Sequence, residues 1–142
     1  MKQLEQSRLT CIFCDDIRDE LSGKTNIIGW FPSDNIVLNN NEPLVLPTLC
    51  VLCLLIISAD KTTASMKVEM LQGETVLQSM NVPIESLEQM KEVFAKDAKD
   101  REIRIAMKLI GFQVNESTSL RVRVTMDGQV IEGNALRFVR QV

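Results

Sequence analysis

The sequence predicts an all-β fold, an antiparallel immunoglobulin-like β-sandwich that carries one amphipathic helix. Apolar and polar residues alternate over much of the chain, and turn residues divide it into about seven to nine short segments. Alternation puts successive side chains on opposite faces of a strand, and many short strands separated by turns are typical of sandwiches. No linker or repeat interrupts the 142 residues, so we expect one domain over residues 1–142.

The first two predicted strands are joined by a tight turn. Residues 8–17 are apolar on both faces, and residues 25–31 follow as a second strand. The turn between them contains Gly23, which accepts a positive φ angle. A short apolar continuation over residues 36–38 then ends in a polar loop.

The longest apolar run predicts the centre of a sheet. It covers residues 44–59, is apolar on both faces and contains Pro47 near its start. A bilayer-spanning helix needs about 20 apolar residues, so a buried strand explains this run better. Residues 1–8 are charged and lack the apolar core of a secretory signal. We expect no membrane association and a cytoplasmic location, or a virion-associated one if a phage encodes the protein.

Two hairpins are predicted from their turn residues. The Gly-Glu turn at 73–74 separates the strands expected over residues 65–72 and 75–82. The Asp-Gly turn at 127–128 leads the alternating strand before it into residues 129–132. Both connections are two residues long, which favours antiparallel neighbours.

An amphipathic helix is expected over residues 86–99. Ser86 and Gln89 have the spacing of a capping box, and Pro83 lies just upstream. The apolar residues that share one face of this helix are Leu87, Met90, Val93, Phe94 and Ala98. We expect the helix to lie on a sheet or across one end of the sandwich.

Basic side chains occupy the polar faces of two strands in the last third of the chain. They are Arg104, Lys108, Arg121 and Arg123. If the two strands are neighbours, the four side chains form one anion-facing stripe, suited to phosphate groups. No aromatic residues are interleaved to stack bases, and antiparallel sheets normally expose charged faces to water. We therefore favour a solvated face and expect no nucleic-acid partner.

Composition narrows the chemistry further. The chain has no histidine and no tyrosine, which excludes serine–histidine and cysteine–histidine nucleophilic pairs within one chain. The net charge of −3 argues against nucleic-acid binding by the whole molecule. Residues 101–142 carry seven basic and four acidic residues, so the positive charge is concentrated at that end. We expect a non-enzymatic protein without a cofactor.

Two Cys-x-x-Cys pairs form the pattern of a four-thiolate zinc site. The four cysteines are Cys11, Cys14, Cys50 and Cys53. Both pairs lie in apolar strand-like sequence, where residues three apart point to opposite faces with Cα atoms about 10 Å apart. We therefore favour small buried side chains, with one cysteine of each pair facing the other across neighbouring strands. Zinc binding by all four is the alternative.

Acidic residues crowd the segment that follows the first pair. Asp15, Asp16, Asp19 and Glu20 are interleaved with Arg18 and followed by Lys24. Such a cluster can hold a divalent cation or supply general acid–base groups. It lacks the regular ligand positions of a calcium loop, so we favour a turn held by internal salt bridges, with Arg18 and Lys24 neutralising part of the charge.

This segment resembles the opening of a bacterial domain family of unknown function. The residues that carry the resemblance are Cys14-Asp15-Asp16-Ile17-Arg18, Glu20, Gly23-Lys24 and Ile28-Gly29. Members of that family continue with a Leu-Pro segment, like Leu46-Pro47, and end with an Asp-Gly hairpin, like Asp127-Gly128. The resemblance implies a compact β-sandwich and supplies no activity, cofactor or catalytic residue.

Together these observations predict an interaction or assembly module of bacterial or phage origin. It would use sheet edges or an exposed apolar patch to bind a protein partner or further copies of itself. The alternative is a small-ligand or metal-binding protein built on the acidic turn from Asp15 to Glu20.

Overall fold

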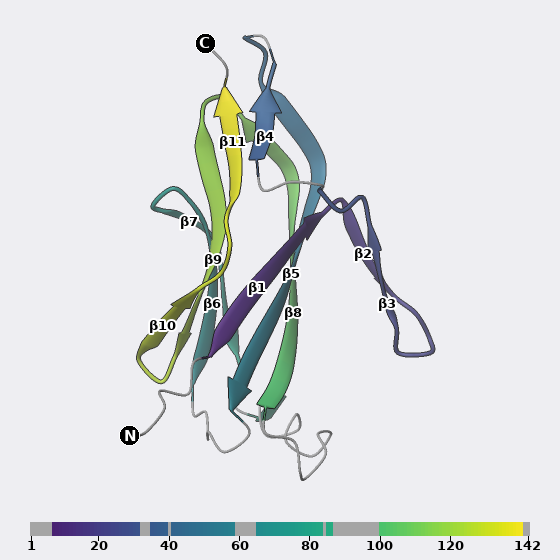
Figure 1. Ribbon diagram of the computed structural model, residues 1–142, viewed down its shortest axis with the longest axis vertical. Helices are drawn as coiled ribbons and strands as arrows, with labels where there is room; N and C mark the ends of the chain where they lie inside the picture. Colours follow the sequence, from purple (N-terminus) through teal and green to yellow (C-terminus); the bar gives the residue numbers. More distant parts are fainter. Residues whose placement is uncertain are drawn as a thin grey trace.

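The structure describes eleven strands, and of the remaining described residues only 85–86 are helical (Figure 1). The computed structural model describes residues 7–31, 35–39, 41–58, 65–83, 85–86 and 100–140. The helix expected over residues 86–99 is not among these elements, and residues 87–99 lie outside the described residues. No helix in the described ranges is long and apolar enough to cross a membrane.

The smaller sheet has three antiparallel strands in the order β1, β5, β8. They are β1 (Arg8–Cys14), β5 (Leu44–Ser58) and β8 (Asp100–Val114). The prediction that the long apolar run forms a sheet centre is confirmed, because β5 pairs on both edges. Pro47 lies opposite Gly111, at the one step where the ladder between β5 and β8 is interrupted.

The larger sheet has the order β4, β11, β9, β6, β7, and β10 also pairs with β9. Its strands are β4 (Asn35–Leu38), β6 (Met66–Gln72), β7 (Thr75–Val82), β9 (Thr118–Met126), β10 (Gln129–Glu132) and β11 (Leu136–Arg140). β4 runs parallel to β11, whereas the other pairs are antiparallel. The sheet is therefore mixed, which corrects the prediction of antiparallel strands only.

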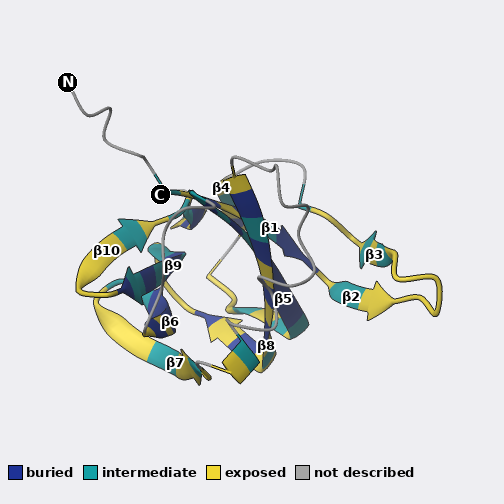
Figure 2. Cartoon of the chain, turned by 90° about the horizontal axis from the view of Figure 1, so that it is seen from below, coloured by how far each residue is buried: buried dark blue, intermediate teal, exposed yellow. Residues whose placement is uncertain are grey.

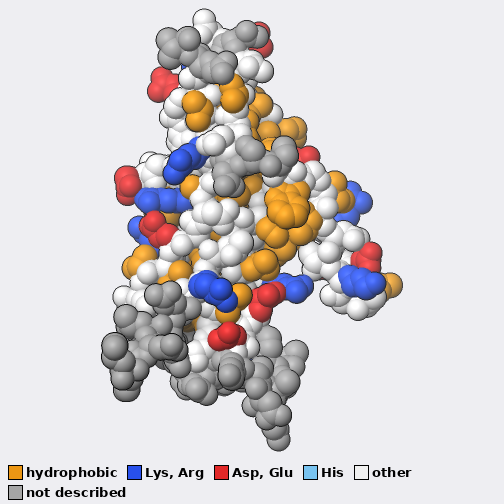
Figure 3. Space-filling view, viewed as in Figure 1, with side chains coloured by type: hydrophobic (Ala, Val, Ile, Leu, Met, Phe, Trp, Pro, Cys, Tyr) orange, Lys and Arg blue, Asp and Glu red, His pale blue; other side chains and the backbone are white. Residues whose placement is uncertain are grey.

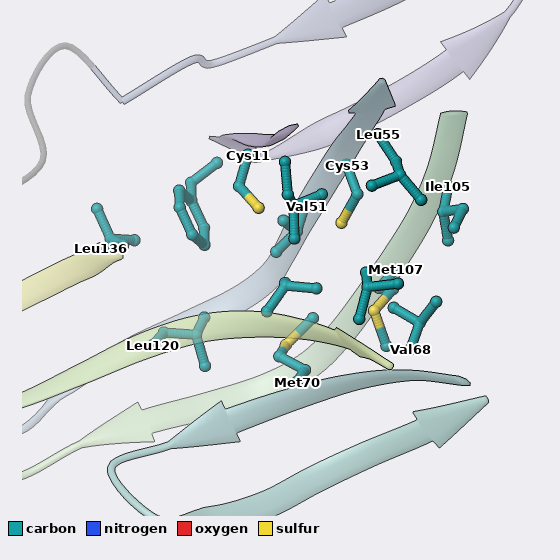
Figure 4. Packing of buried hydrophobic residues seen from close by; sticks show 14 of the residues in the cluster. Cys11, Val51, Cys53, Leu55, Val68, Met70, Ile105, Met107, Leu120 and Leu136 are labelled. Carbon is teal, nitrogen blue, oxygen red and sulfur yellow. The ribbon is translucent and has the colours of Figure 1, made fainter. Parts of the chain in front are cut away.

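The two sheets share one hydrophobic core, because alternate residues of each strand point toward the other sheet. Figure 2 shows buried segments on β5, β6 and β9 and exposed segments on β7 and β10. In Figure 4, Val51 and Leu55 of β5 lie across from Met70 of β6 and Leu120 of β9. Complete burial of such side chains stabilises the fold by about 1.5–3 kcal/mol each.

Both predicted hairpins are confirmed. β6 and β7 pair across the turn that contains Gly73, which has a φ of 58°. β9 and β10 pair across Asp127 and Gly128, whose φ angles are 49° and 82°. Positive φ at both central residues is the requirement of a type I′ turn.

The strand predicted over residues 8–17 is divided in two. β1 ends at Cys14, and β2 (Asp16–Asp19) pairs with β3 (Thr25–Ile28) in a separate two-stranded sheet. The chain leaves the smaller sheet at Asp15, whose amide N–H donates to the carbonyls of Ile28 and Gly29 instead of to β5. The resulting hairpin projects from the side of the molecule (Figure 1).

Candidate functional site

The projecting hairpin, with its root residues, covers residues 15–29 and is called the hairpin arm below. Ile17 lies opposite Ile27 in its two-stranded ladder. Its tip is closed by two backbone hydrogen bonds, from Glu20 N–H to the carbonyl of Lys24 (2.8 Å) and from Gly23 N–H to the carbonyl of Glu20 (3.0 Å). Gly23 has a φ of 87°, so the predicted turn is confirmed.

The root of the arm is held by a close approach between Asp15 and Gly29. Gly29 has a φ of 67°, and a Cβ atom there would lie 2.1 Å from Oδ2 of Asp15. The Asp15 amide donates to the carbonyls of Ile28 (2.9 Å) and Gly29 (3.2 Å). The hydroxyl of Thr48, on β5, donates to the carbonyl of Asp15 (2.9 Å). These contacts fix the direction in which the arm leaves the smaller sheet.

Gly29→Ala is expected to lower the free energy of unfolding by about 2 kcal/mol, because alanine is strained at this φ and its methyl group meets Asp15. Gly23→Ala is the matched control, since Gly23 also has a positive φ but nothing lies within 4 Å of an added Cβ. We expect the control substitution to lower the free energy of unfolding by about 1 kcal/mol. Urea denaturation followed by circular dichroism measures both, and equal losses would contradict the close packing at the root.

Asp16 and Arg18 form the ion pair expected within the acidic turn. Nε of Arg18 donates to Oδ2 of Asp16 at 3.0 Å, and both side chains are partly or largely exposed. The Arg18 hydrogen bond lowers the pKa of Asp16 below its usual value, and the Ile17 N–H that donates to the same carboxylate adds to the effect. The pair therefore stabilises the ionised carboxylate along one strand of the arm.

The remaining acidic residues of the arm also bond within it. Asp19 accepts a hydrogen bond from the Thr25 hydroxyl (3.3 Å), and Glu20 accepts one from Nδ2 of Asn26 (2.9 Å). Lys24 contributes its backbone carbonyl to the turn. Among the described residues, no three cysteine, aspartate or glutamate side chains come together in a group that could hold a metal ion.

A cleft of about 400 Å³ lies between the arm and the outer face of the smaller sheet. One wall comes from the arm and the floor from β5 and β8. Its lining includes Asp16, Ile17, Asp19, Cys50, Arg104 and Lys108. The cleft therefore combines the acidic turn with two of the predicted basic residues. Sequence reasoning treated these two groups as unrelated features and missed the cleft.

The four predicted basic residues do not form one stripe. β8, with Arg104 and Lys108, belongs to the smaller sheet, and β9, with Arg121 and Arg123, belongs to the larger one. The short connection between β8 and β9 crosses from one sheet to the other, so the two strands are not neighbours. The prediction of adjacent strands, and of a single stripe across them, is wrong.

Arg121 and Arg123 form ion pairs with carboxylates of the larger sheet. Arg121 contacts Glu74 at 3.0 Å and Glu132 at 3.3 Å. Arg123 contacts Glu69 at 3.2 Å, and the Glu69 residue is buried. These ion pairs connect β9 to neighbouring parts of the larger sheet and stabilise that sheet.

The cysteines lie opposite each other in two cross-strand pairs, Cys11 with Cys53 and Cys14 with Cys50. Cys11 and Cys53 belong to the core between the sheets, whereas Cys50 lines the cleft on the outer face. The expectation that cysteines face each other across neighbouring strands is confirmed. Because the pairs lie on opposite faces of the sheet, the four thiols do not converge on one zinc ion.

All four cysteines are free and buried, and their surroundings favour the neutral thiol at three of them. Burial raises the pKa of Cys14 to about 11, and burial also raises the pKa of Cys50. The hydrogen-bonded Cys11 thiol is the main cause of a raised pKa at Cys53, followed by burial. Buried neutral thiols are poor nucleophiles, which separates them from the cysteines of catalytic sites.

A protein-family comparison covers nearly the whole described fold. The family model matches residues 9–139, from the second residue of β1 to the last but one of β11. The chain belongs to DUF6941, a family of unknown function. Its predicted membership of a family of unknown function is thus supported, whereas the bacterial or phage origin stays a prediction. No curated protein matches the chain.

This DUF6941 chain exposes large apolar side chains on and near the arm. Leu21, at the tip, is fully exposed, and Trp30, directly after the arm, is 65% exposed. Figure 3 shows hydrophobic side chains gathered on the surface beside the root of the arm. Sequence analysis assigned Leu21 to a turn and Trp30 to a strand, and did not single out either. The sequence feature that could have indicated this exposed apolar surface was a leucine at the tip of a glycine-containing turn.

Proposed function

We propose that this DUF6941 chain is a non-enzymatic interaction module that assembles with further copies of itself through the hairpin arm. The observation that carries the proposal is the arm, which projects from the two-sheet body in both views (Figures 1 and 2). Leu21, at its tip, is fully exposed. A chain that builds such an extension around an exposed leucine gains burial only when another surface covers it.

The physical properties of a hairpin support this interpretation. An isolated two-stranded hairpin is marginally stable in water, and this one is held to the body mainly at its root. Burial of one leucine contributes about 2 kcal/mol, which is too little for a stable complex. The arm therefore needs further contacts, which electrostatic attraction can supply.

Charge complementarity favours a second copy as the occupant. Residues 15–29 contain four acidic and two basic residues, whereas residues 101–142 contain seven basic and four acidic ones. Several of the latter are exposed, including Arg104, Lys108 and Arg137. The arm of one copy is therefore attracted to the exposed basic side chains of another, and added salt weakens that attraction.

Leu21→Ser is expected to weaken self-association about tenfold without loss of stability, because Leu21 contacts little within its own chain. Sedimentation velocity over a range of protein concentrations measures the association, with salt as a second variable. Val130→Ser is the matched control, since Val130 is 56% exposed on a different hairpin. A wild-type protein that stays monomeric at every concentration, or equal effects of both substitutions, would overturn the proposal.

The cleft favours a second candidate function, the binding of a small ligand beside the acidic turn. Its volume of about 400 Å³ lies within the usual range for ligand sites, and its walls carry both signs of charge. Thermal unfolding with added free amino acids, Mg²⁺ or Ca²⁺ tests this function. Stabilisation that is lost on Asp15→Asn and Asp16→Asn supports it, and no stabilisation by any of them counts against it.

We also propose that the fold is an immunoglobulin-like sandwich. The order β1–β5–β8 corresponds to strands A, B and E of that fold, and β11–β9–β6–β7 corresponds to G, F, C and C′. The shared core between these two sheets supports the same assignment. An experimental structure with a different order of strands would contradict it.

A further inference from the structure

Cys11 and Cys53 face each other at a position that suits a covalent link. Cys11 is the register partner of Cys53 in β5, but its backbone groups point away from that strand: its N–H donates to Oδ1 of Asn134 (2.7 Å), and its carbonyl accepts from Nδ2 of the same side chain (2.9 Å). Cys11 and Cys53 therefore form a non-hydrogen-bonded pair, in which Cα atoms lie about 4.5 Å apart. Disulfides need a Cα separation of about 4.4–6.8 Å.

The two side chains also point the same way. Both belong to the core between the sheets, and Figure 4 shows both sulfur atoms on the inner side of β1 and β5. The Cys11 thiol is also the main cause of the raised pKa at Cys53, so the two thiols are neighbours in the core. Directly opposite residues of a non-hydrogen-bonded pair have Cβ atoms about 4.5 Å apart, at the upper end of the separation of about 3.5–4.5 Å that disulfides show. A small adjustment of the two strands therefore brings the sulfur atoms within bonding reach.

We propose that Cys11 and Cys53 are a modification site, at which a peroxide oxidises the two thiols to a cross-strand disulfide. Cys11 reacts first, because it lies on the edge strand and keeps 4% exposure, whereas Cys53 has none. Its sulfur takes one peroxide oxygen as the O–O bond breaks, and the other oxygen leaves as water. The Cys53 thiol then attacks the Cys11 sulfur while its proton passes to the departing hydroxyl, which leaves as a second water. The two thiol protons end in the two waters, and the peroxide is the species reduced.

The second pair provides an internal comparison. Hydrogen-bonded and non-hydrogen-bonded pairs alternate along an antiparallel ladder, so Cys14, three residues after Cys11, falls in a hydrogen-bonded pair, where opposite side chains lie farther apart than in a non-hydrogen-bonded pair. The Cys14 thiol also points to backbone oxygens, with the carbonyl of Asp16 at 3.6 Å and that of Cys50 at 3.7 Å. We expect Cys14 and Cys50 to stay reduced under conditions that link Cys11 to Cys53.

The disulfide would fasten the edge strand β1 to the central strand β5. The arm begins at the end of β1, so the link would enclose the whole arm within one covalent loop. Closing a loop of this length restricts the unfolded chain, and we expect the melting temperature to rise by roughly 10 °C.

The test uses the folded protein and dilute hydrogen peroxide. Free thiols are alkylated after the reaction, and the protein is digested without reduction for mass spectrometry. The variant Cys14→Ala with Cys50→Ala keeps the proposed pair, and the matched variant Cys11→Ala with Cys53→Ala keeps the other. We expect one Cys11–Cys53 disulfide in the wild type and the first variant, none in the second, and a higher melting temperature after oxidation.

Three results would overturn the proposal. These are four free thiols in the treated wild type, oxidation of Cys11 to its sulfinic acid without a crosslink, and a link between Cys14 and Cys50 instead. Circular dichroism checks that each variant is folded. If either variant is not, the peptide map of the wild type alone decides the question.

Discussion

Phe138→Ala is expected to lower the free energy of unfolding by about 3–5 kcal/mol. Phe138 is the largest of the side chains that are fully buried in the described residues, and its ring lies 5.9 Å from that of Phe112, at an interplanar angle of 57°. This contact joins β11 of the larger sheet to β8 of the smaller one. Truncation removes it and leaves a cavity between the sheets that the surrounding strands fill only in part. Urea denaturation followed by circular dichroism measures the loss.

Val139→Ala is the matched control for this substitution. Val139 is the next residue of β11 and is 42% exposed, because successive side chains of a strand point to opposite faces. We expect a loss below about 1 kcal/mol for the control. Similar losses at both positions would mean that β11 does not present Phe138 to the space between the sheets.

Asn134→Ala is expected to cost about 2–4 kcal/mol, although the residue lies outside any strand. Its side-chain amide accepts a hydrogen bond from the N–H of Cys11 and donates one to the carbonyl of Cys11, as the backbone of a neighbouring strand would. Alanine leaves the N–H and the carbonyl of Cys11 without these partners at the edge of the smaller sheet. Chemical denaturation measures the loss of stability. Hydrogen exchange at the Cys11 amide measures directly how well the edge of the smaller sheet is protected.

Asn26→Ala is the control for the loss of an asparagine side chain. Asn26 lies in the exposed arm and donates one hydrogen bond to Glu20. We expect a loss below about 0.5 kcal/mol there. Unchanged exchange at the Cys11 amide in Asn134→Ala would show that the side chain does not protect this edge.

Features set by neighbouring residues were predictable from the sequence. The turn at Gly73 follows from the φ angle that glycine accepts, and the turn at Asp127 and Gly128 from the two residues that a type I′ turn prefers. The central position of β5 follows from its two apolar faces, which only a strand covered on both sides can bury. In each case the residues that determine the structure lie close together in the sequence.

The membership of strands in sheets was not predictable in the same way. Alternation in β8 and β9 shows which residues share a face, but not whether the strands pair. A short connection suits a hairpin within one sheet and equally a crossing between two sheets. The structure has the crossing, which separates Arg104 and Lys108 from Arg121 and Arg123. The cleft beside the arm depends on this placement and was missed for the same reason.

Contacts between distant residues leave no local pattern at all. Asn134 bonds to Cys11 across more than a hundred residues, and Gly133 leaves room for the sulfur of Cys11, which would lie 2.7 Å from an added Cβ. Neither residue belongs to a motif that the sequence analysis identified. The approach of Gly29 to Asp15 was likewise hidden, although the sequence analysis singled out both residues.

The parallel pairing of β4 with β11 determines when the protein can complete its fold during synthesis. β4 emerges from the ribosome early, but the strand that satisfies its edge is made after every other described strand. The hairpins β6–β7 and β9–β10 can form from local contacts, whereas β4 has to wait with its backbone groups in water. We therefore expect the nascent chain to keep one open sheet edge until β11 is free, and to depend most on chaperones in that interval.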